Sequence, residues 1–133
     1  MGQGTPITPT ASKPFAGKRI LIVEDEYFLA DDLADEFSRL GAKVIGPLSE
    51  VVEAQEILQS GGPIDAALLD INLRSEMIFP LARALRERAI SFVFTTGYDK
   101  TTIRPEFADV PLWEKPFDVP ALAEGVAELL KRR

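Results

Sequence analysis

The chain has 133 residues, which suits one domain of ordinary size, and 46% of them are hydrophobic, which is enough for a buried core. Histidine and cysteine are both absent, so disulfides, thiolate nucleophiles, zinc sites of the usual kind and Ser-His-Asp catalysis are excluded. The net charge is −6 and basic residues are scattered apart from the terminal Lys131-Arg132-Arg133, so we expect no direct binding to nucleic acid.

Residues 1–17 are rich in threonine, proline and glycine, which predicts a flexible tail, either native or left over from cloning. This segment has no basic region followed by an apolar one, as a secretory signal would. No apolar stretch approaches the ~20 residues that span a membrane. We therefore expect a cytoplasmic protein without membrane insertion, whose single domain covers residues 18–133.

Short apolar runs alternate with segments that have helical periodicity along the domain. The runs predict strands over residues 18–23, 43–45, 64–69, 91–95 and 109–113. The periodic segments predict helices over residues 26–40, 50–59 and 79–88, and a last helix that follows Asp118 as its cap; Ser49 is the expected cap of the second helix. Residues 98–108 are ambiguous, since Pro105 breaks any long helix there. This alternation predicts an α/β fold with a parallel sheet and helices on both faces.

Charged residues follow several of the predicted strands at the point where each strand ends. Glu24 and Asp25 follow the first strand, Asp70 follows the third, and Lys115 comes soon after the fifth. In an open parallel sheet, ligands bind at the carboxyl ends of the strands. Adjacent carboxylates repel each other, and a hard cation such as Mg²⁺ would compensate them. The pattern therefore predicts a cation-dependent phosphate site.

Each of these residues also has a purely structural explanation. Glu24 and Asp25 would favour the N-terminus of the following helix, and Asp70 would favour a turn after a strand. Thr95-Thr96-Gly97 ends the predicted fourth strand, where a hydroxyl would reach a phosphoryl oxygen, but threonine is common at the end of a strand. A lysine before proline, such as Lys115, is likewise common in a loop. The functional interpretation rests on the order of the motifs, because four independent structural explanations in that order are improbable.

Taken together, these motifs resemble those of the receiver domain of two-component response regulators. The matching segments are Ile20-Leu21-Ile22-Val23-Glu24-Asp25-Glu26, Leu68-Leu69-Asp70-Ile71-Asn72-Leu73, Thr96-Gly97 and Lys115-Pro116-Phe117. The resemblance covers about residues 18–133. It implies a flavodoxin-like (βα)5 three-layer sandwich, with a parallel five-stranded sheet in the order 2-1-3-4-5 and its ligand site at the switch point of the sheet.

The resemblance also implies a role for each residue of the site. Asp70 matches the phosphoacceptor, Thr96 the switch hydroxyl, and Lys115 the lysine that neutralises the phosphoryl group. The metal, Mg²⁺ or Mn²⁺, would be held by two kinds of ligand, namely carboxylates and one backbone carbonyl. These ligands are Glu24 (through water), Asp25, Asp70 and the carbonyl of Asn72.

The chain departs from the family pattern at the position three residues before the conserved lysine. An aromatic switch residue is usual there, and this chain has Leu112. The run Phe94-Thr95-Thr96-Gly97-Tyr98 resembles a receiver subgroup whose fourth strand ends Phe-Ala-Thr-Gly-Tyr, with Thr95 in place of the alanine. Receivers of that subgroup are often stand-alone proteins.

The resemblance implies a stand-alone receiver that accepts a phosphoryl group on Asp70 from a sensor histidine kinase or a phosphotransfer protein. It would act on a protein partner or as a phosphate sink, as a monomer or weak dimer, and not as an enzyme beyond slow self-dephosphorylation. One alternative is a receiver-fold binding module that is never phosphorylated. Another is an aspartyl-phosphate phosphohydrolase, but such enzymes place a second aspartate where this chain has Asn72.

Overall fold

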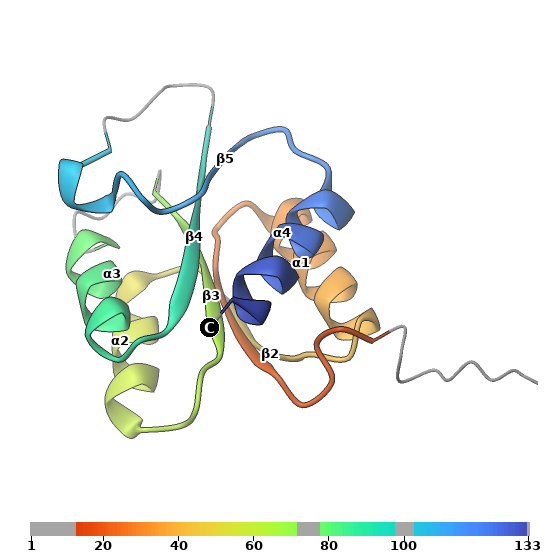
Figure 1. Cartoon of the computed structure of the whole chain (residues 1–133), viewed down its shortest axis with the longest axis horizontal. Helices are drawn as coiled ribbons and strands as arrows, with labels where there is room; N and C mark the ends of the chain where they lie inside the picture. Colours follow the sequence, from red (N-terminus) through yellow and green to blue (C-terminus); the bar gives the residue numbers. More distant parts are fainter. Residues whose placement is uncertain (1–12, 72–77, 98–102, 133) are drawn as a thin grey trace, which may run out of the picture.

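The computed structural model describes residues 13–71, 78–97 and 103–132. Its centre is a parallel five-stranded sheet in the order β2-β1-β3-β4-β5 (Figure 1), which confirms the predicted fold class. The strands are β1 (Arg19–Val23), β2 (Lys43–Leu48), β3 (Ala66–Asp70), β4 (Ser91–Thr96) and β5 (Leu112–Glu114). Every neighbouring pair in the sheet is parallel.

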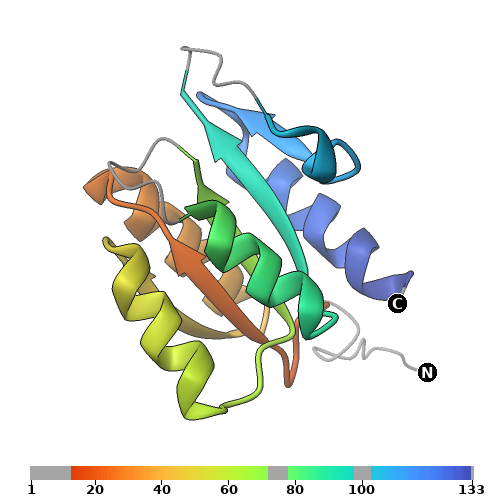
Figure 2. The same cartoon turned by 90° about the vertical axis from the view of Figure 1, so that its left-hand side faces the viewer.

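Helices cover both faces of the sheet, so the molecule has three layers. The helices are α1 (Tyr27–Arg39), α2 (Val51–Ser60), α3 (Ile78–Glu87) and α4 (Val119–Lys131), with a short 3-10 helix, η3 (Pro105–Phe107). Helices α2 and α3 lie on one face, and α1 and α4 lie on the other (Figures 1 and 2).

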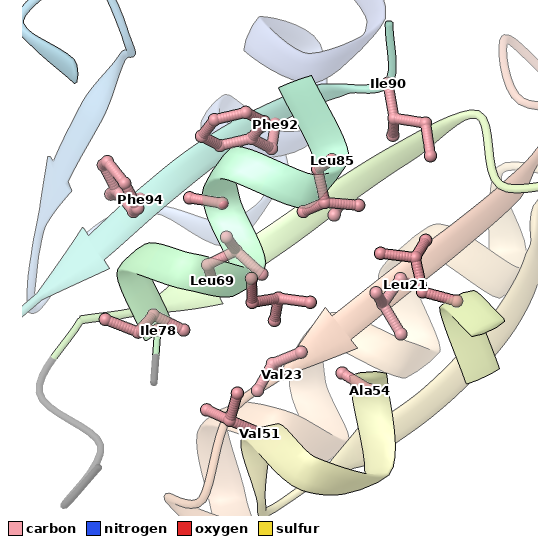
Figure 3. Close-up of a cluster of buried hydrophobic side chains, with 14 of the residues drawn as sticks. Leu21, Val23, Val51, Ala54, Leu69, Ile78, Leu85, Ile90, Phe92 and Phe94 are labelled. Carbon is pink, nitrogen blue, oxygen red and sulfur yellow. The ribbon is translucent and has the colours of Figure 1, made fainter. Parts of the chain in front are cut away.

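Alternation along the strands divides the apolar side chains between the two faces. Leu21 and Val23 of β1 pack with α2 and α3 (Figure 3), whereas Ile20 and Ile22 pack with α1 and α4. All residues of β3 are buried, because this strand lies in the middle of the sheet and is covered on both faces. The continuous apolar run before Asp70 thus places that carboxylate at the carboxyl end of the central strand.

Several predicted boundaries differ from the structure. Strand β2 continues through Gly46 and Pro47 to Leu48, where the expected strand ended at residue 45. Gly46 permits this with φ 106°, since a Cβ there would lie 2.7 Å from Leu48 N. The predicted Ser49 cap is wrong: Glu50 is the N-cap of α2 and makes no side-chain cap bond. Asp118 does cap α4, accepting a hydrogen bond from Ala121 N at 2.9 Å.

The packed domain begins before residue 18. The Phe15 side chain is fully buried and its ring centroid lies 4.9 Å from that of Phe37 in α1. Its backbone N–H donates to Leu40 O at 3.0 Å. The flexible tail expected over residues 1–17 therefore does not include Phe15. The sequence did not indicate this, because one aromatic residue in a polar segment makes no periodic pattern.

The ambiguous segment before β5 holds η3 in its described part, and β5 itself begins at Leu112 rather than at residue 109. Phe107 of η3 is buried against the α3 face of the sheet. Among the helices that the structure describes, none is both long enough and apolar enough to cross a membrane.

Candidate functional site

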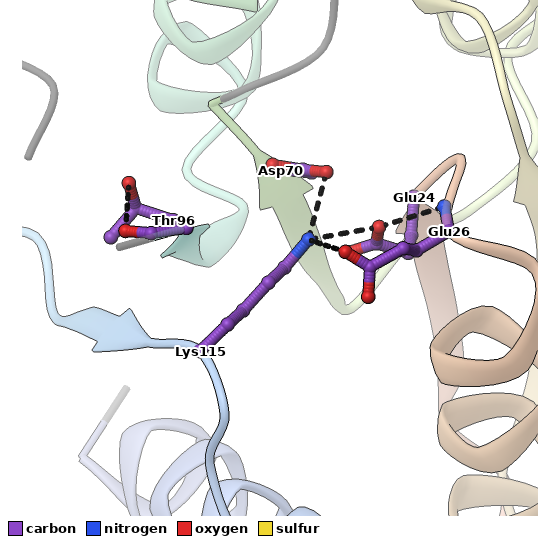
Figure 4. A network of polar contacts seen from close by, with 6 residues as sticks. Glu24, Glu26, Asp70, Thr96 and Lys115 are labelled. Carbon is purple, nitrogen blue, oxygen red and sulfur yellow. Dashed lines mark hydrogen bonds and ion pairs between the residues drawn. The ribbon is translucent and has the colours of Figure 1, made fainter. Parts of the chain in front are cut away.

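The carboxyl ends of four strands meet at one edge of the sheet and bring together most of the residues singled out in the sequence. Glu24 directly follows β1, and Asp70 is the last residue of β3. Thr96 ends β4, and Lys115 directly follows β5. The Lys115 side chain reaches from β5 across to Asp70 and Glu24 (Figure 4), so the strand order 2-1-3-4-5 places Asp70 between the lysine and the acids of β1.

The Lys115 ammonium makes the central contacts of the site. Lys115 Nζ donates to Glu24 Oε2 at 3.0 Å and to Asp70 Oδ2 at 3.1 Å. Both carboxylates are almost completely buried, at 3% and 2% exposed, and the lysine side chain is 12% exposed. Because charges are costly to bury without partners, the lysine makes it possible to hold these two acids side by side.

Glu24 titrates unusually. Burial, followed by the negative charge of Asp70, raises the pKa of Glu24 from 4.5 to about 7. Hydrogen bonds from the backbone N–H of Glu26, at 3.0 Å, and from Lys115 act in the opposite direction and only partly offset the rise. Without a further cation, this site therefore carries more negative charge than Lys115 alone compensates.

Lys115 responds to the same surroundings. Burial by itself would lower the pKa of Lys115, but hydrogen bonds and charge from Glu24 and Asp70 outweigh burial and raise the pKa above its ordinary value. The lysine is therefore a fixed positive charge at neutral pH. It can pair with an anion that arrives at Asp70.

The donor set fits a hard divalent cation. Carboxylate oxygens of Glu24, Asp25 and Asp70 lie within 4.8 Å of one another. Glu24 Oε1 is buried and has no hydrogen-bond partner among the described residues, as expected of an atom that awaits a cation or its water. Asp25 is exposed at the rim, where a partly hydrated ion would sit. Asn72, the fourth expected ligand, lies outside the described residues.

Two threonines end β4. Thr96, the expected switch hydroxyl, is buried, and its Oγ1 donates to Gly97 O at a long 3.4 Å; its own carbonyl accepts from Lys115 N at 2.7 Å. Thr95 points to the other face, because neighbouring residues of a strand alternate. Its buried Oγ1 has no hydrogen-bond partner among the described residues.

Sequence reasoning assigned no role to Glu26, which belongs to the site. Glu26 Oε2 lies 3.6 Å from Lys115 Nζ, and the side chain is 63% exposed. The sequence signal was present, since Glu26 is the third acid after β1. An acid at this position also predicts the start of a helix, and Glu26 is indeed the N-cap of α1.

Position 112 does not supply an aromatic or hydroxyl group. Leu112 is 41% exposed, while the neighbouring Trp113 is half-buried and packs on the α4 face with Phe117 at a centroid distance of 6.3 Å. The aromatic ring of β5 thus lies on the face of the sheet opposite to α3. Tyr98, the aromatic residue that follows Gly97 after β4, lies outside the described residues.

Solved structures of known proteins resemble this chain in both fold and sequence. SdrG from Sphingomonas melonis Fr1 is 41% identical, with a TM-score of 0.73 over 85% of this chain and 96% of that chain. The receiver domain of TorR, the response regulator of the TMAO respiratory system, is 33% identical, with a TM-score of 0.75 over 86% of this chain and 98% of that chain. A response regulator receiver protein from Sinorhizobium medicae WSM419 is 28% identical, with a TM-score of 0.73, over 86% of this chain and 94% of that chain.

No family model matches the sequence, and no curated protein matches it. Identity of this level over almost the whole length of SdrG and of the TorR receiver domain nevertheless decides the family. The strand order and the edge that gathers Glu24, Asp70 and Lys115 agree with that assignment. The chain belongs to the response-regulator receiver family of two-component signalling.

Proposed function

We propose that this receiver accepts a phosphoryl group on Asp70 from the phosphohistidine of a sensor kinase or phosphotransfer protein. The observation that carries the proposal is the Asp70 carboxylate itself. It ends the central strand β3, is 2% exposed, and lies 3.1 Å from a lysine whose positive charge is fixed. These 133 residues contain no histidine, so the phosphohistidine that serves as donor lies outside them.

In the proposed reaction, a carboxylate oxygen of Asp70 attacks phosphorus and the bond between phosphorus and the imidazole nitrogen of the donor breaks. The imidazole leaves with the electron pair of that bond, and Asp70 becomes an acyl phosphate. Lys115 would pair with a phosphoryl oxygen, and the Thr96 hydroxyl would donate to another. A Mg²⁺ or Mn²⁺ ion held by Glu24, Asp25, Asp70 and the Asn72 carbonyl would supply positive charge that offsets the transferred negative charge.

We propose that the output is a changed protein surface. Phosphorylation adds roughly −1.5 to −2 charge at the site, if the acyl phosphate resembles other phosphorylated residues. Such a charge biases an equilibrium between conformations that the receiver already populates. The partner that reads this change is a protein, or the receiver serves as a sink that drains phosphoryl groups from a kinase.

Intact-mass measurement after incubation with acetyl phosphate and Mg²⁺ tests the proposal. We expect wild type to gain one phosphoryl mass, and Asp70→Asn to gain none while keeping its fold. Asp35→Asn, which changes an exposed acid of α1, is the matched control and should react like wild type. Equal labelling of Asp70→Asn and wild type would refute the assignment of the acceptor.

Absence of labelling in wild type, even with the kinases of its own cell as donors, would instead favour a binding module that is not phosphorylated. Phosphotransfer profiling against those kinases also separates the two outputs. A sink would return phosphoryl groups to a kinase or lose them quickly, whereas a signalling receiver would keep them long enough to engage a partner.

A further inference from the structure

The connection between β4 and β5 is fastened to α3 by two arginines. Arg83 of α3 donates to both carboxylate oxygens of Glu106, at 2.8 and 2.9 Å. Arg86, about one turn further along α3, donates to the Glu106 backbone carbonyl at 2.8 Å and to both carboxylate oxygens of Asp109, at 3.0 and 3.1 Å. We call these four residues the arginine clamp.

Beneath the arginine clamp lies an aromatic cluster. The buried Phe107 ring stacks on Phe79 of α3 at a centroid distance of 5.7 Å and meets Phe94 of β4 edge-on at 5.6 Å. The Arg86 guanidinium lies over the rings of Phe107 and Phe92, at 5.3 and 5.7 Å. The described part of the connection is therefore fixed to α3 by buried aromatic side chains and, at the surface, by ion pairs. Figure 1 shows η3 beside α3 on the same face of the sheet.

The two ends of this connection are residues of the phosphorylation site. Thr96 ends β4 before the connection, and Lys115 follows β5 after it. Ile71, which follows Asp70, is held to β4, because its backbone N–H donates to Thr95 O at 3.0 Å. Any displacement of Lys115 toward a phosphoryl group on Asp70 therefore pulls on the described residues 103–111, which α3 holds through Glu106 and Asp109.

Of the attachments made by the described residues 103–111, the ion pairs of the arginine clamp are the exposed ones. The side chains of Arg83 and Glu106 are 41% and 46% exposed. Exposed ion pairs stabilise a structure little, whereas the β-ladder and the buried Phe107 are costly to disrupt. The hydrogen bond from Arg83 lowers the pKa of Glu106, so this pair stays charged at neutral pH. A displacement at the site is therefore relieved first at the clamp.

Resting on the proposed function, we infer that the arginine clamp is a latch that stabilises the unphosphorylated conformation and opens when Asp70 is phosphorylated. Opening of the latch would change the surface formed by α3 and η3, and this change would be the output signal. Such an output does not need an aromatic switch residue at position 112, where this chain has an exposed leucine. The coupling free energy between two sites is the same in both directions. If phosphorylation of Asp70 weakens the latch, removal of the latch must therefore raise the affinity of the site for a phosphoryl mimic by the same free energy.

The test compares Arg83→Gln/Arg86→Gln with wild type, using beryllofluoride and Mg²⁺ as the phosphoryl mimic in a titration followed by amide NMR. We expect the variant to bind beryllofluoride about fivefold more tightly. We also expect hydrogen exchange at the amides of Phe107 and Val110 to accelerate in saturated wild type. In the variant, this exchange should be fast before the probe is added.

Arg39→Gln is the matched control, because Arg39 makes a similar exposed ion pair with Glu36, at 2.8 Å on α1, away from the connection. It should bind beryllofluoride like wild type. Equal or weaker affinity in the double variant, in a protein whose wild type binds the probe, would overturn the latch alone. Failure of wild type to bind, or binding by Asp70→Asn at wild-type affinity, would overturn the proposed function and the latch with it.

Discussion

Lys115 Nζ lies 3.0 Å from Glu24 Oε2, although the two residues are 91 positions apart in the chain. The same ammonium contacts Asp70, so one lysine pairs with two buried carboxylates. This shared pairing joins the carboxyl ends of β1 and β3 to the residue that follows β5.

Removal of the lysine should destabilise the fold. In Lys115→Met, Glu24 and Asp70 remain buried without their cation, and we expect the free energy of unfolding at neutral pH to fall by about 3 kcal/mol. Urea denaturation in metal-free buffer measures this loss. Lys131→Met is the control, since that lysine pairs with Glu128 at the exposed surface, and it should change stability by less than about 0.5 kcal/mol. A similar small effect for both variants would show that the pair at the site is not stabilising.

The raised pKa of Glu24 predicts a pH dependence of stability without metal. Between 4.5 and about 7 the folded state binds more protons at Glu24 than the unfolded chain does. The contribution of Glu24 to stability is therefore full below pH 4.5 and is lost as the pH rises to about 7, by roughly 3 kcal/mol.

Urea titrations of wild type and Glu24→Gln across this pH range measure that loss. The Gln variant should lose this part of the slope, because its amide does not titrate. Carboxyl NMR of Glu24 gives the pKa directly, and a value near 4.5 would contradict the assigned environment. In Asp70→Asn the pKa should fall, since the neighbouring negative charge is removed.

Asp25 should control cation affinity. Its carboxylate is one of three whose oxygens lie within 4.8 Å of one another, and we expect Asp25→Asn to weaken Mg²⁺ binding by about tenfold or more. Isothermal titration calorimetry measures the affinity. Asp31→Asn removes an exposed acid of α1 outside that group and should bind like wild type. Unchanged affinity in Asp25→Asn would place the cation elsewhere.

Phe15 should prove part of the core. We expect Phe15→Ala to lower the free energy of unfolding by about 3–5 kcal/mol, because the side chain is fully buried against Phe37. Phe28→Ala offers the contrast, since Phe28 is 80% exposed, and it should lie within about 0.5 kcal/mol of wild type. Thermal or urea unfolding of the two variants would reject the buried position of Phe15 if both losses were small.

Gly125 leaves room for the tryptophan ring. A Cβ at this position of α4 would lie 2.9 Å from Trp113 Cζ2, so the ring must shift in Gly125→Ala. Alanine also favours a helix by about 1 kcal/mol over glycine, which offsets the cost of that shift. We expect a small net change in stability together with a changed fluorescence emission of Trp113, the single tryptophan of the chain. An unaltered emission spectrum would mean that the ring does not contact α4.

Local pattern predicted much of the fold. The apolar runs before Glu24 and Asp70 marked β1 and β3, and helical spacing marked α1 and α3 to within a residue at each end. The predicted end of an element was wrong where contacts with a distant part of the chain set it. Strand β2 passes through Gly46-Pro47, a pair that normally ends strands, because its pairing with β1 extends to Leu48 after an irregularity in register.

Part of the candidate site was also predictable, because the ends of parallel strands meet at one edge whatever their separation in sequence. That rule anticipated the meeting of Asp70 with Glu24 and Lys115. It gave no basis for the contact between Glu26 and Lys115, which depends on where the first turn of α1 lies relative to β5. The roles of Asp70, Thr96 and Lys115, and of the expected metal ligands, stay predictions.

By itself, the sequence determined the α/β class and the edge at which charged groups collect, because both follow from local periodicity and from the end of each apolar run. Only the tertiary structure decided how those groups act on one another. The raised pKa of Glu24, the burial of Phe15 and the arginine clamp between α3 and η3 all depend on distances between residues far apart in the chain. Packing fixes such distances, and with them the desolvation and charge that a linear pattern does not contain.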